Sequence, residues 1–197
     1  MSGPSAAADI ELRDVRAGYE QPVVGPISLR IARGSVVTLW GPNGSGKTTL
    51  LNTISGGARV FGGSVTRRPG LRVSHQHQNA LPISGIPLSG RELMALTGAD
   101  PAAVPPAVLP LLHRRLSDLS GGQLQLLQVL ACLLAPVDLV LLDEPTNNVD
   151  GQGVTYLERA LAGVRTHRTV LLVSHDRRFV EAVSDEIVEL TEAVVTT

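Results

Sequence analysis

Short, continuous apolar runs mark the buried strands of this chain. They occupy residues 36–40, 139–142 and 169–173, and strands that are buried on both faces of a parallel sheet show such runs in place of alternation. Residues 10–15 and 27–31 alternate apolar and polar side chains instead, which is typical of strands with one exposed face. The pattern therefore predicts an α/β chain built on a mainly parallel sheet.

The remaining segments predict helices and three short strands. Helical patterns cover residues 48–54, 91–96, 109–116, 123–134, 154–164 and the segment through Phe179 and Val183, whereas residues 64–66, 71–73 and 187–190 are expected to be strands. Residues 87–119 carry no strand signal, so we expect a small helical subdomain inserted into the α/β core, over about residues 87–134 with the helix that follows. At 197 residues the chain suits a single domain over residues 9–197, with residues 1–8 as a disordered tail.

A glycine-rich loop joins the strand at residues 36–40 to the helix at residues 48–54. It matches the phosphate-binding pattern G-x-x-x-x-G-K-[ST] at every fixed position. In such a loop, glycines bring backbone N–H groups close to phosphate oxygens, and the helix N-terminus adds a partial positive charge. Lys47, the only lysine in the chain, is expected beside the β- and γ-phosphates, and the Thr48 hydroxyl is expected to ligate Mg²⁺. The nucleotide-binding residues predicted here are Gly41, Pro42, Asn43, Gly44, Ser45, Gly46, Lys47, Thr48 and Thr49.

Composition and charge argue against several other classes of protein. The formal net charge is −1 and the arginines are scattered, so the sequence shows no electrostatic footprint for nucleic acid, and no nucleic-acid partner is expected. The single cysteine, Cys132, excludes an internal disulfide and is expected in the core. The sequence shows no signal peptide, and no apolar run reaches membrane-spanning length. We therefore expect a cytoplasmic protein that lies peripherally on the inner face of the cell membrane and reaches it through another chain.

The pentapeptide Leu119-Ser120-Gly121-Gly122-Gln123 lies between the glycine-rich loop and the strand that ends at Asp143-Glu144. In this order the motifs resemble those of ABC-type ATPases, and the resemblance covers about residues 10–190. It implies a P-loop NTPase core with a mainly parallel sheet, an N-terminal antiparallel β subdomain and a short inserted helical subdomain. It also implies ATP and Mg²⁺ as cofactors and ATP hydrolysis as the activity.

The resemblance also gives roles to single residues. Asp143 stands where these ATPases hold Mg²⁺, Glu144 where they orient or deprotonate the attacking water, and His175 where they contact the γ-phosphate. Local chemistry agrees, because two adjacent carboxylates at a buried strand end repel each other and favour a cation nearby. A hinge glutamine is expected near Mg²⁺ and the attacking water; we assign it to Gln78, with Gln76 as the alternative.

Further residues extend the predicted site beyond one chain. Tyr19 stands where the family stacks an aromatic ring on adenine, a contact worth about 1–3 kcal/mol; packing at a strand end is the other interpretation. The family's signature caps the ATP held by a second subunit, so a head-to-tail homodimer that sandwiches ATP is expected. The residues added to the nucleotide site in this way are Ser120, Gly121, Gly122, Gln123 and Asp150.

The chain departs from the family pattern in a few places. Asn147 and Asn148 are unusual for transporters, and Leu124 and Leu126 stand where many relatives have arginine. The run His75-Gln76-His77-Gln78 places two histidines on one strand face, which allows a metal site or ordinary polar strand positions; no third ligand is near in sequence. The departures at residues 124, 126, 147 and 148, together with the short helical subdomain, bear on the partner and not on nucleotide binding.

The function that the resemblance implies is the ATP-hydrolysing subunit of a bacterial ABC transporter, working with transmembrane permease subunits and a substrate-binding protein. The stretch from Leu71 to Pro87 resembles metal-importer ATPases and favours a divalent metal ion such as zinc or manganese as the substrate. Two alternatives stay open: an ATPase of an exporter of haem or another small molecule, and a soluble ABC-type switch acting on ribosome or DNA machinery. The sequence leaves the direction of transport undecided.

Overall fold

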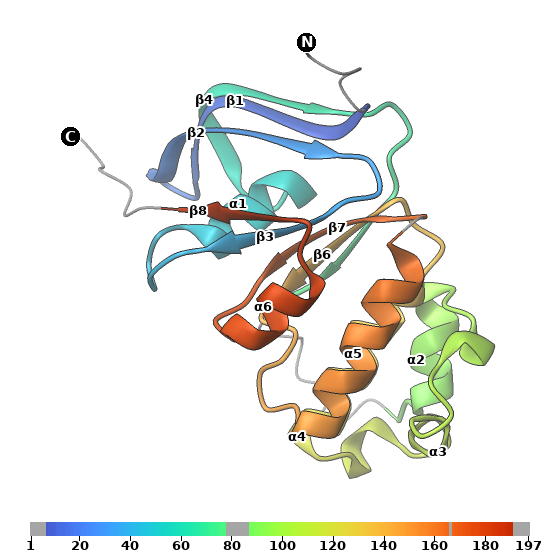
Figure 1. Cartoon of the computed structure of the whole chain (residues 1–197). Helices are drawn as coiled ribbons and strands as arrows, with labels where there is room; N and C mark the ends of the chain where they lie inside the picture. The colour runs from blue at the N-terminus through green and yellow to red at the C-terminus, as the bar shows by residue number, and fades with distance from the viewer. Residues whose placement is uncertain (1–6, 78–86, 166, 191–197) are drawn as a thin grey trace.

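Two sheets and a group of helices make up the computed structural model in Figure 1. The structure describes residues 7–77, 87–165 and 167–190. A three-stranded sheet has the order β2-β1-β4 and a five-stranded sheet the order β5-β6-β7-β3-β8. The strands are β1 (Ala8–Gly18), β2 (Pro22–Ala32), β3 (Val36–Trp40), β4 (Arg59–Arg67), β5 (Val73–Gln76), β6 (Leu139–Asp143), β7 (Thr169–Val173) and β8 (Glu186–Glu189).

The helices lie mostly on one side of the five-stranded sheet, with α1 on the other side together with the three-stranded sheet (Figure 1). They are α1 (Lys47–Ser55), α2 (Gly90–Thr97), α3 (Leu109–Leu112), α4 (Gly121–Leu134), α5 (Gly151–Val164) and α6 (Arg177–Val183), with short 3₁₀ turns η1 (Pro101–Ala103) and η2 (Leu116–Asp118). No described helix is both long and apolar enough to cross a bilayer.

The predicted fold class is confirmed. All pairings in the five-stranded sheet are parallel, and both pairings in the three-stranded sheet are antiparallel. The continuous apolar runs form β3, β6 and β7, the central strands, and every residue of β6 and β7 is buried. The division into a tail, one domain and a helical subdomain stays a prediction.

β1, β2 and β4 are longer than the strands expected from the sequence, and two other segments start or end elsewhere. The helix expected over residues 109–116 ends at Leu112, because the chain after it pairs with the start of α2: Ser89 and Arg115 form an isolated bridge, and Leu116 N donates to Leu88 O at 2.8 Å. The strand expected at residues 71–73 starts only at Val73, because a turn precedes it in which Leu71 N donates to Arg68 O.

The two faces of the five-stranded sheet are covered by separate cores, and successive strand residues alternate between them. Val140 and Leu142 of β6 face a core shared with α4, α5 and α6. Leu139 and Leu141 face a core shared with α1 and the three-stranded sheet. Each fully buried side chain of this kind contributes about 1.5–3 kcal/mol by leaving water. This packing sets the ends of β3, β6 and β7 side by side.

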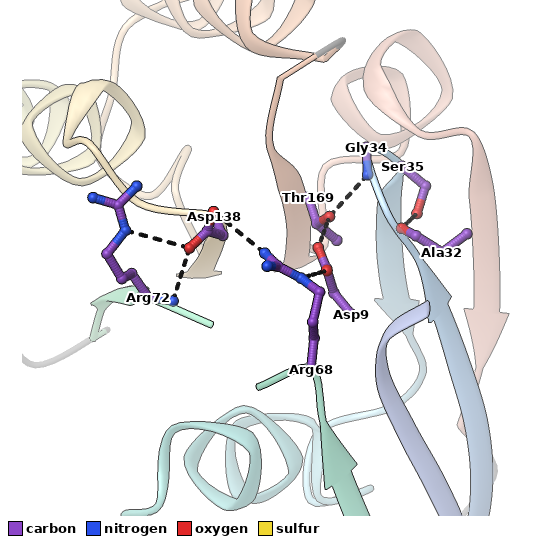
Figure 2. Close-up of polar contacts among 8 residues, drawn as sticks. All are labelled: Asp9, Ala32, Gly34, Ser35, Arg68, Arg72, Asp138 and Thr169. Atoms are coloured by element: carbon purple, nitrogen blue, oxygen red, sulfur yellow. Dashed lines mark hydrogen bonds and ion pairs between the residues drawn. The ribbon is translucent and has the colours of Figure 1, made fainter. Parts of the chain in front are cut away.

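A chain of polar contacts ties the two sheets together at the opposite edge from those ends (Figure 2). Asp9, 1% exposed on β1, accepts from Arg68 Nε at 2.7 Å and from the Thr169 hydroxyl at 2.6 Å. Thr169 in turn accepts from Gly34 N at 2.9 Å. Arg68 also reaches Asp138, which precedes β6 and accepts from Arg72 N at 2.9 Å. These contacts therefore hold the start of β1 and the chain after β4 against the starts of β6 and β7.

Candidate functional site

The glycine-rich loop leaves β3 and enters α1 in a conformation that only glycine adopts easily. Gly44 and Gly46 have φ of 82° and 88°, in the left-handed region. A Cβ on Gly46 would lie 2.5 Å from Val24 Cβ, so β2 packs directly against the loop. The loop is therefore held close to β2, while a Cβ on Gly44 would meet nothing within 4 Å.

Lys47 lies buried at the start of α1, and its ammonium group holds the loop closed. Its Nζ donates to Gly41 O at 2.9 Å and to Pro42 O at 2.8 Å, which uses two of its three N–H donors. Burial lowers the pKa of Lys47, and the nearby carboxylates of Glu144 and Asp143 partly offset that shift. The remaining donor and the positive charge are available to an anion beside the loop.

A pocket of about 470 Å³ opens between this loop and the carboxyl ends of β6 and β7. In a parallel sheet this edge is where ligands bind. The pocket brings together the loop, the carboxylates after β6 and the histidine after β7. Its lining residues are Val23, Asn43, Gly44, Gly46, Lys47, Thr48, Thr49, Asp143, Glu144, Asn147, Val173 and His175.

Asp143, the last residue of β6, is 1% exposed. Thr48 donates a side-chain hydrogen bond to its carboxylate, while Oδ1 has no partner within the described part of the chain. Burial raises the pKa of Asp143; the Thr48 bond and the charges of His77 and Lys47 oppose the shift. A carboxylate oxygen without a partner beside a threonine hydroxyl is a donor set that fits Mg²⁺.

Glu144 follows in a strained backbone conformation, with φ of 52° in the left-handed region. Its N–H donates to Val173 O at 2.9 Å and its C=O accepts from Gln125 Nε2 at 3.2 Å, so the backbone is held from both sides. The side chain is 5% exposed. Burial raises the pKa of Glu144, and His175 is the largest influence in the other direction. A carboxylate of this kind is a better base near neutral pH than an exposed one.

His175 orients the Glu144 carboxylate. Its Nε2 lies 3.1 Å from Glu144 Oε1, and its backbone N–H donates to Glu144 Oε2 at 3.3 Å. The imidazole is about half exposed, lines the pocket and packs edge-on against Trp40. It therefore contacts the pocket and the carboxylate at the same time, a link that the sequence did not indicate.

Several predicted residues lie elsewhere on the described chain and do not line this pocket. Tyr19 is 51% exposed, and its hydroxyl accepts from Asn52 Nδ2 at 2.7 Å. Asp150 caps α5 by accepting from Gly153 N at 2.7 Å. Gln78 lies outside the described residues; Gln76, the alternative, is buried and donates to His77 O.

The signature also lies apart from the pocket, at the start of α4. Ser120 and Gln123 form a capping box: Gln123 N donates to the Ser120 hydroxyl at 3.2 Å, and Ser120 N donates to Gln123 Oε1 at 3.1 Å. A Cβ on Gly121 would meet nothing within 4 Å, whereas one on Gly122 would overlap the Asn148 carbonyl oxygen. Packing in the described chain therefore accounts for Gly122 but not for Gly121.

Sequence reasoning missed three pocket residues, Val23, Asn147 and Val173. Val23 on β2 and Val173 on β7 are apolar strand residues, and their residue type gives no signal of a ligand site. Asn147 follows the Asp143-Glu144 pair closely, so its proximity to them was the available clue. The rings of His75 and His77 lie 3.7 Å apart, and no group of three or more potential metal ligands occurs among the described residues.

Comparisons with known proteins agree on one family. A family model described as "ABC transporter" matches residues 24–87. The zinc import ATP-binding protein ZnuC of Cereibacter sphaeroides is 37% identical over 91% of this chain and 77% of that protein. The protein of the same name from Alkalilimnicola ehrlichii is 39% identical over 96% of this chain and 77% of that protein.

Solved structures show the same fold. An ABC transporter ATP-binding protein from Pyrococcus furiosus superposes with a TM-score of 0.76 at 25% identity, covering 92% of this chain and 96% of that one. A complex of the archaeal ribosome recycling factor with a ribosomal stalk protein superposes with a TM-score of 0.82 at 24% identity, covering 96% of this chain and 38% of that one. The second likeness bears on the fold alone.

The contact between Asn52 and Tyr19 generates a prediction for ATP binding. Asn52→Ala removes the donor that holds the Tyr19 ring, so the KM for ATP should rise about 2- to 10-fold, the range of one neutral hydrogen bond, with kcat unchanged. Tyr19→Phe should match it, because it removes the other partner. Inhibition by tripolyphosphate, which has no base to stack, is the control and should not change. If Asn52→Ala weakens inhibition by tripolyphosphate to the same extent as ATP binding, Asn52 supports the glycine-rich loop and not the Tyr19 ring.

Proposed function

From the premise that this chain belongs to the family of ABC transporter ATPases, we propose that it is the ATP-hydrolysing subunit of a zinc importer. The observation that carries the proposal is the similarity to zinc import ATP-binding proteins, which extends over about three quarters of their length at 37% and 39% identity. These relatives favour zinc over manganese and import over export. The likenesses to a ribosome recycling factor and to an exporter lie below 25% identity and carry no function.

In this proposal, a charged side chain and backbone N–H groups bind different phosphates of the nucleotide. Lys47 offers its free donor and its charge to the terminal phosphates, and the loop N–H groups surround the others. Thr48 and Asp143 would hold Mg²⁺, which when bound neutralises phosphate charge. Its positive charge would also offset the cost of burying Asp143, whose pKa is raised by desolvation. The hinge role of Gln78 stays part of this proposal.

Glu144 is the general base in this proposal, and His175 is the residue that positions it. Both carboxylate oxygens are engaged by His175, which fixes the direction in which a water proton would be accepted. The raised pKa of Glu144 brings the carboxylate nearer to the pKa that suits a base at neutral pH.

The second half of the site is proposed to come from another copy of the chain. The signature residues Ser120 and Gly121 present a helix N-terminus that lies outside the pocket of their own chain. Gly121 has open space around it, as expected for a position that a phosphate approaches from outside. ATP would then form part of the interface, so the dimer should form with ATP and loosen after hydrolysis.

The partners follow from the family and not from contacts of this chain. Transporter ATPases act with membrane-spanning permease subunits, and none of the helices in the described part of this chain can span a bilayer. We therefore propose a permease dimer as the docking partner, a zinc-binding protein on the far side of the membrane, and a peripheral location on the inner face.

The first prediction of this proposal concerns Glu144→Gln. The rate of hydrolysis should fall on the order of 10²–10⁴-fold, the usual contribution of a general base, while ATP binding persists. In the wild type, activity should be lost as pH falls through the raised pKa of Glu144, since the protonated carboxyl cannot accept a proton. Initial rates across a pH series would measure both effects. Glu158→Gln, a half-exposed glutamate on α5, is the matched control. Near wild-type hydrolysis by Glu144→Gln would transfer the role to His175.

The second prediction tests the shared site. Lys47→Ala and Gly121→Asp should each be inactive in the assembled transporter. Gly121→Asp should fold, because a Cβ there meets nothing within 4 Å and an acidic side chain suits the first turn of a helix. Mixing the two chains should restore hydrolysis, because each mixed dimer holds one intact loop facing one intact signature. Mixing Lys47→Ala with Glu144→Gln is the control and should restore nothing, since both changes affect the same half of the site. Equal results from the two mixtures would reject the head-to-tail arrangement.

The third prediction concerns the transported ion. Cells without this chain should lose uptake of radioactive zinc under zinc depletion, and manganese uptake should be unaffected. The wild-type gene should restore zinc uptake and Glu144→Gln should not. Normal zinc uptake in the deletion strain, with a defect in another solute, would refute zinc as the substrate and leave the ATPase assignment intact.

A further inference from the structure

A second and larger cavity lies on the helical side of the chain, away from the nucleotide pocket. It measures about 720 Å³, within the range of small-molecule sites. The segment from Asp100 to Ala107 forms one wall and the second half of α5 forms the other. Leu134, at the end of α4, and the turn after α5 complete it.

Small side chains on facing walls create this space. Ala103, Pro105, Pro106 and Ala107 face the cavity from one side, and Ala160 and Gly163 face it from α5. Gly163 is the last residue but one of α5, and glycine is a weaker helix former than alanine. A Cβ there would meet nothing within 4 Å, so packing in the described chain does not explain the glycine. The facing walls are mainly apolar, Tyr156 adds an aromatic surface, and Asp100, Arg159, His167 and Arg168 also line the cavity.

Of the three charged side chains that line the cavity, Arg168 and Asp100 make hydrogen bonds within the described chain and Arg159 does not. Arg168 donates to the carbonyls of Leu133 and Leu134 and so caps α4. Asp100 is also engaged, because its carboxylate accepts from Ala102 N at 2.9 Å. Arg159 is exposed, and within the described part of the chain it makes no hydrogen bond or ion pair. The residues four positions before and after it are Thr155 and Gly163, so no carboxylate lies at helical spacing.

We propose that this cavity is an accessory site for a small organic anion with an aromatic or branched apolar body. The anionic group would pair with Arg159, and the body would fill the space over Gly163, about 6 Å further along α5. Arg168 at the C-terminus of α4 already donates to the Leu133 and Leu134 carbonyls, so Arg159 is the guanidinium left for an anion. An unpaired guanidinium beside apolar walls matches an anionic amphiphile better than a neutral one.

The test compares two fluorescent probes on the full chain. Anilinonaphthalene sulfonate carries an anionic group on an aromatic body, and N-phenylnaphthylamine has a similar body without the charge. The sulfonate should bind at one saturable site and more tightly than the neutral probe, and saturating ATP with Mg²⁺ should not displace it. Displacement by ATP would place the probe in the nucleotide pocket and overturn the assignment.

Variants locate the site. Gly163→Leu fills the cavity and should abolish binding of the sulfonate probe, whereas Gly163→Ala adds one methyl and should retain it; both residues are better helix formers than glycine, so both variants should fold. Arg159→Gln should weaken the sulfonate on the order of tenfold, the equivalent of one charge-assisted hydrogen bond, and leave the neutral probe unchanged. Arg33→Gln, an exposed arginine outside the cavity lining, is the matched control.

Three results would overturn the proposal. Unchanged sulfonate binding in Gly163→Leu would place the site elsewhere. Equal effects of Arg159→Gln and Arg33→Gln would remove the case for an anion. Loss of sulfonate binding when the chain is assembled with its membrane partner would identify the cavity as a protein docking surface. None of these results depends on the nature of the transported ion.

Discussion

Two adjacent carboxyl groups at the end of β6 set the main constraint on this structure. Asp143 and Glu144 are almost fully buried, and burial raises the pKa of both, so each ionised group costs free energy in the folded chain. Compensation comes from elements far apart in the sequence: Lys47 at the start of α1, the Thr48 hydroxyl beside it, and His175 after β7. These groups meet only when β3, β6 and β7 align in parallel. The proposed phosphate site and the stability of the strand ends therefore depend on the same charge interactions.

The alignment of those strands is secured away from the site. The polar contacts of Asp9 with Arg68 and Thr169 connect the three-stranded sheet to the start of β7, and Arg68 continues to Asp138 before β6 (Figure 2). These residues lie at the edge opposite the pocket. The pocket edge can therefore keep strained features, such as the left-handed backbone of Glu144, because packing and polar contacts elsewhere hold the strands.

Packing on the helical side of the five-stranded sheet accounts for the leucines at positions 124 and 126, which depart from the family pattern. Leu126 is 6% exposed and belongs to the core shared with α5, and Leu124 packs against the same core. The apolar residues of α4 are therefore used inside the chain and need no partner. The glycines at the start of the helix differ in the same way: the close approach of Asn148 accounts for Gly122, while the space around Gly121 is open. Internal packing therefore accounts for one of these two adjacent glycines and leaves the other open to solvent.

The sequence alone determined the features that depend on near neighbours. Continuous apolar runs identified β3, β6 and β7, the glycines identified the phosphate-type loop, and the order of motifs identified the family. The tertiary structure decided whatever depends on distant segments. The bridge between Ser89 and Arg115 ends α3 early, and β2 brings Val23 into the pocket. Tertiary packing likewise sets the two contacts of His175 with the Glu144 carboxylate and the separation of Ser120 from the pocket. Local patterns record which side chains are buried, but which groups meet depends on how the sheets and helices pack against each other.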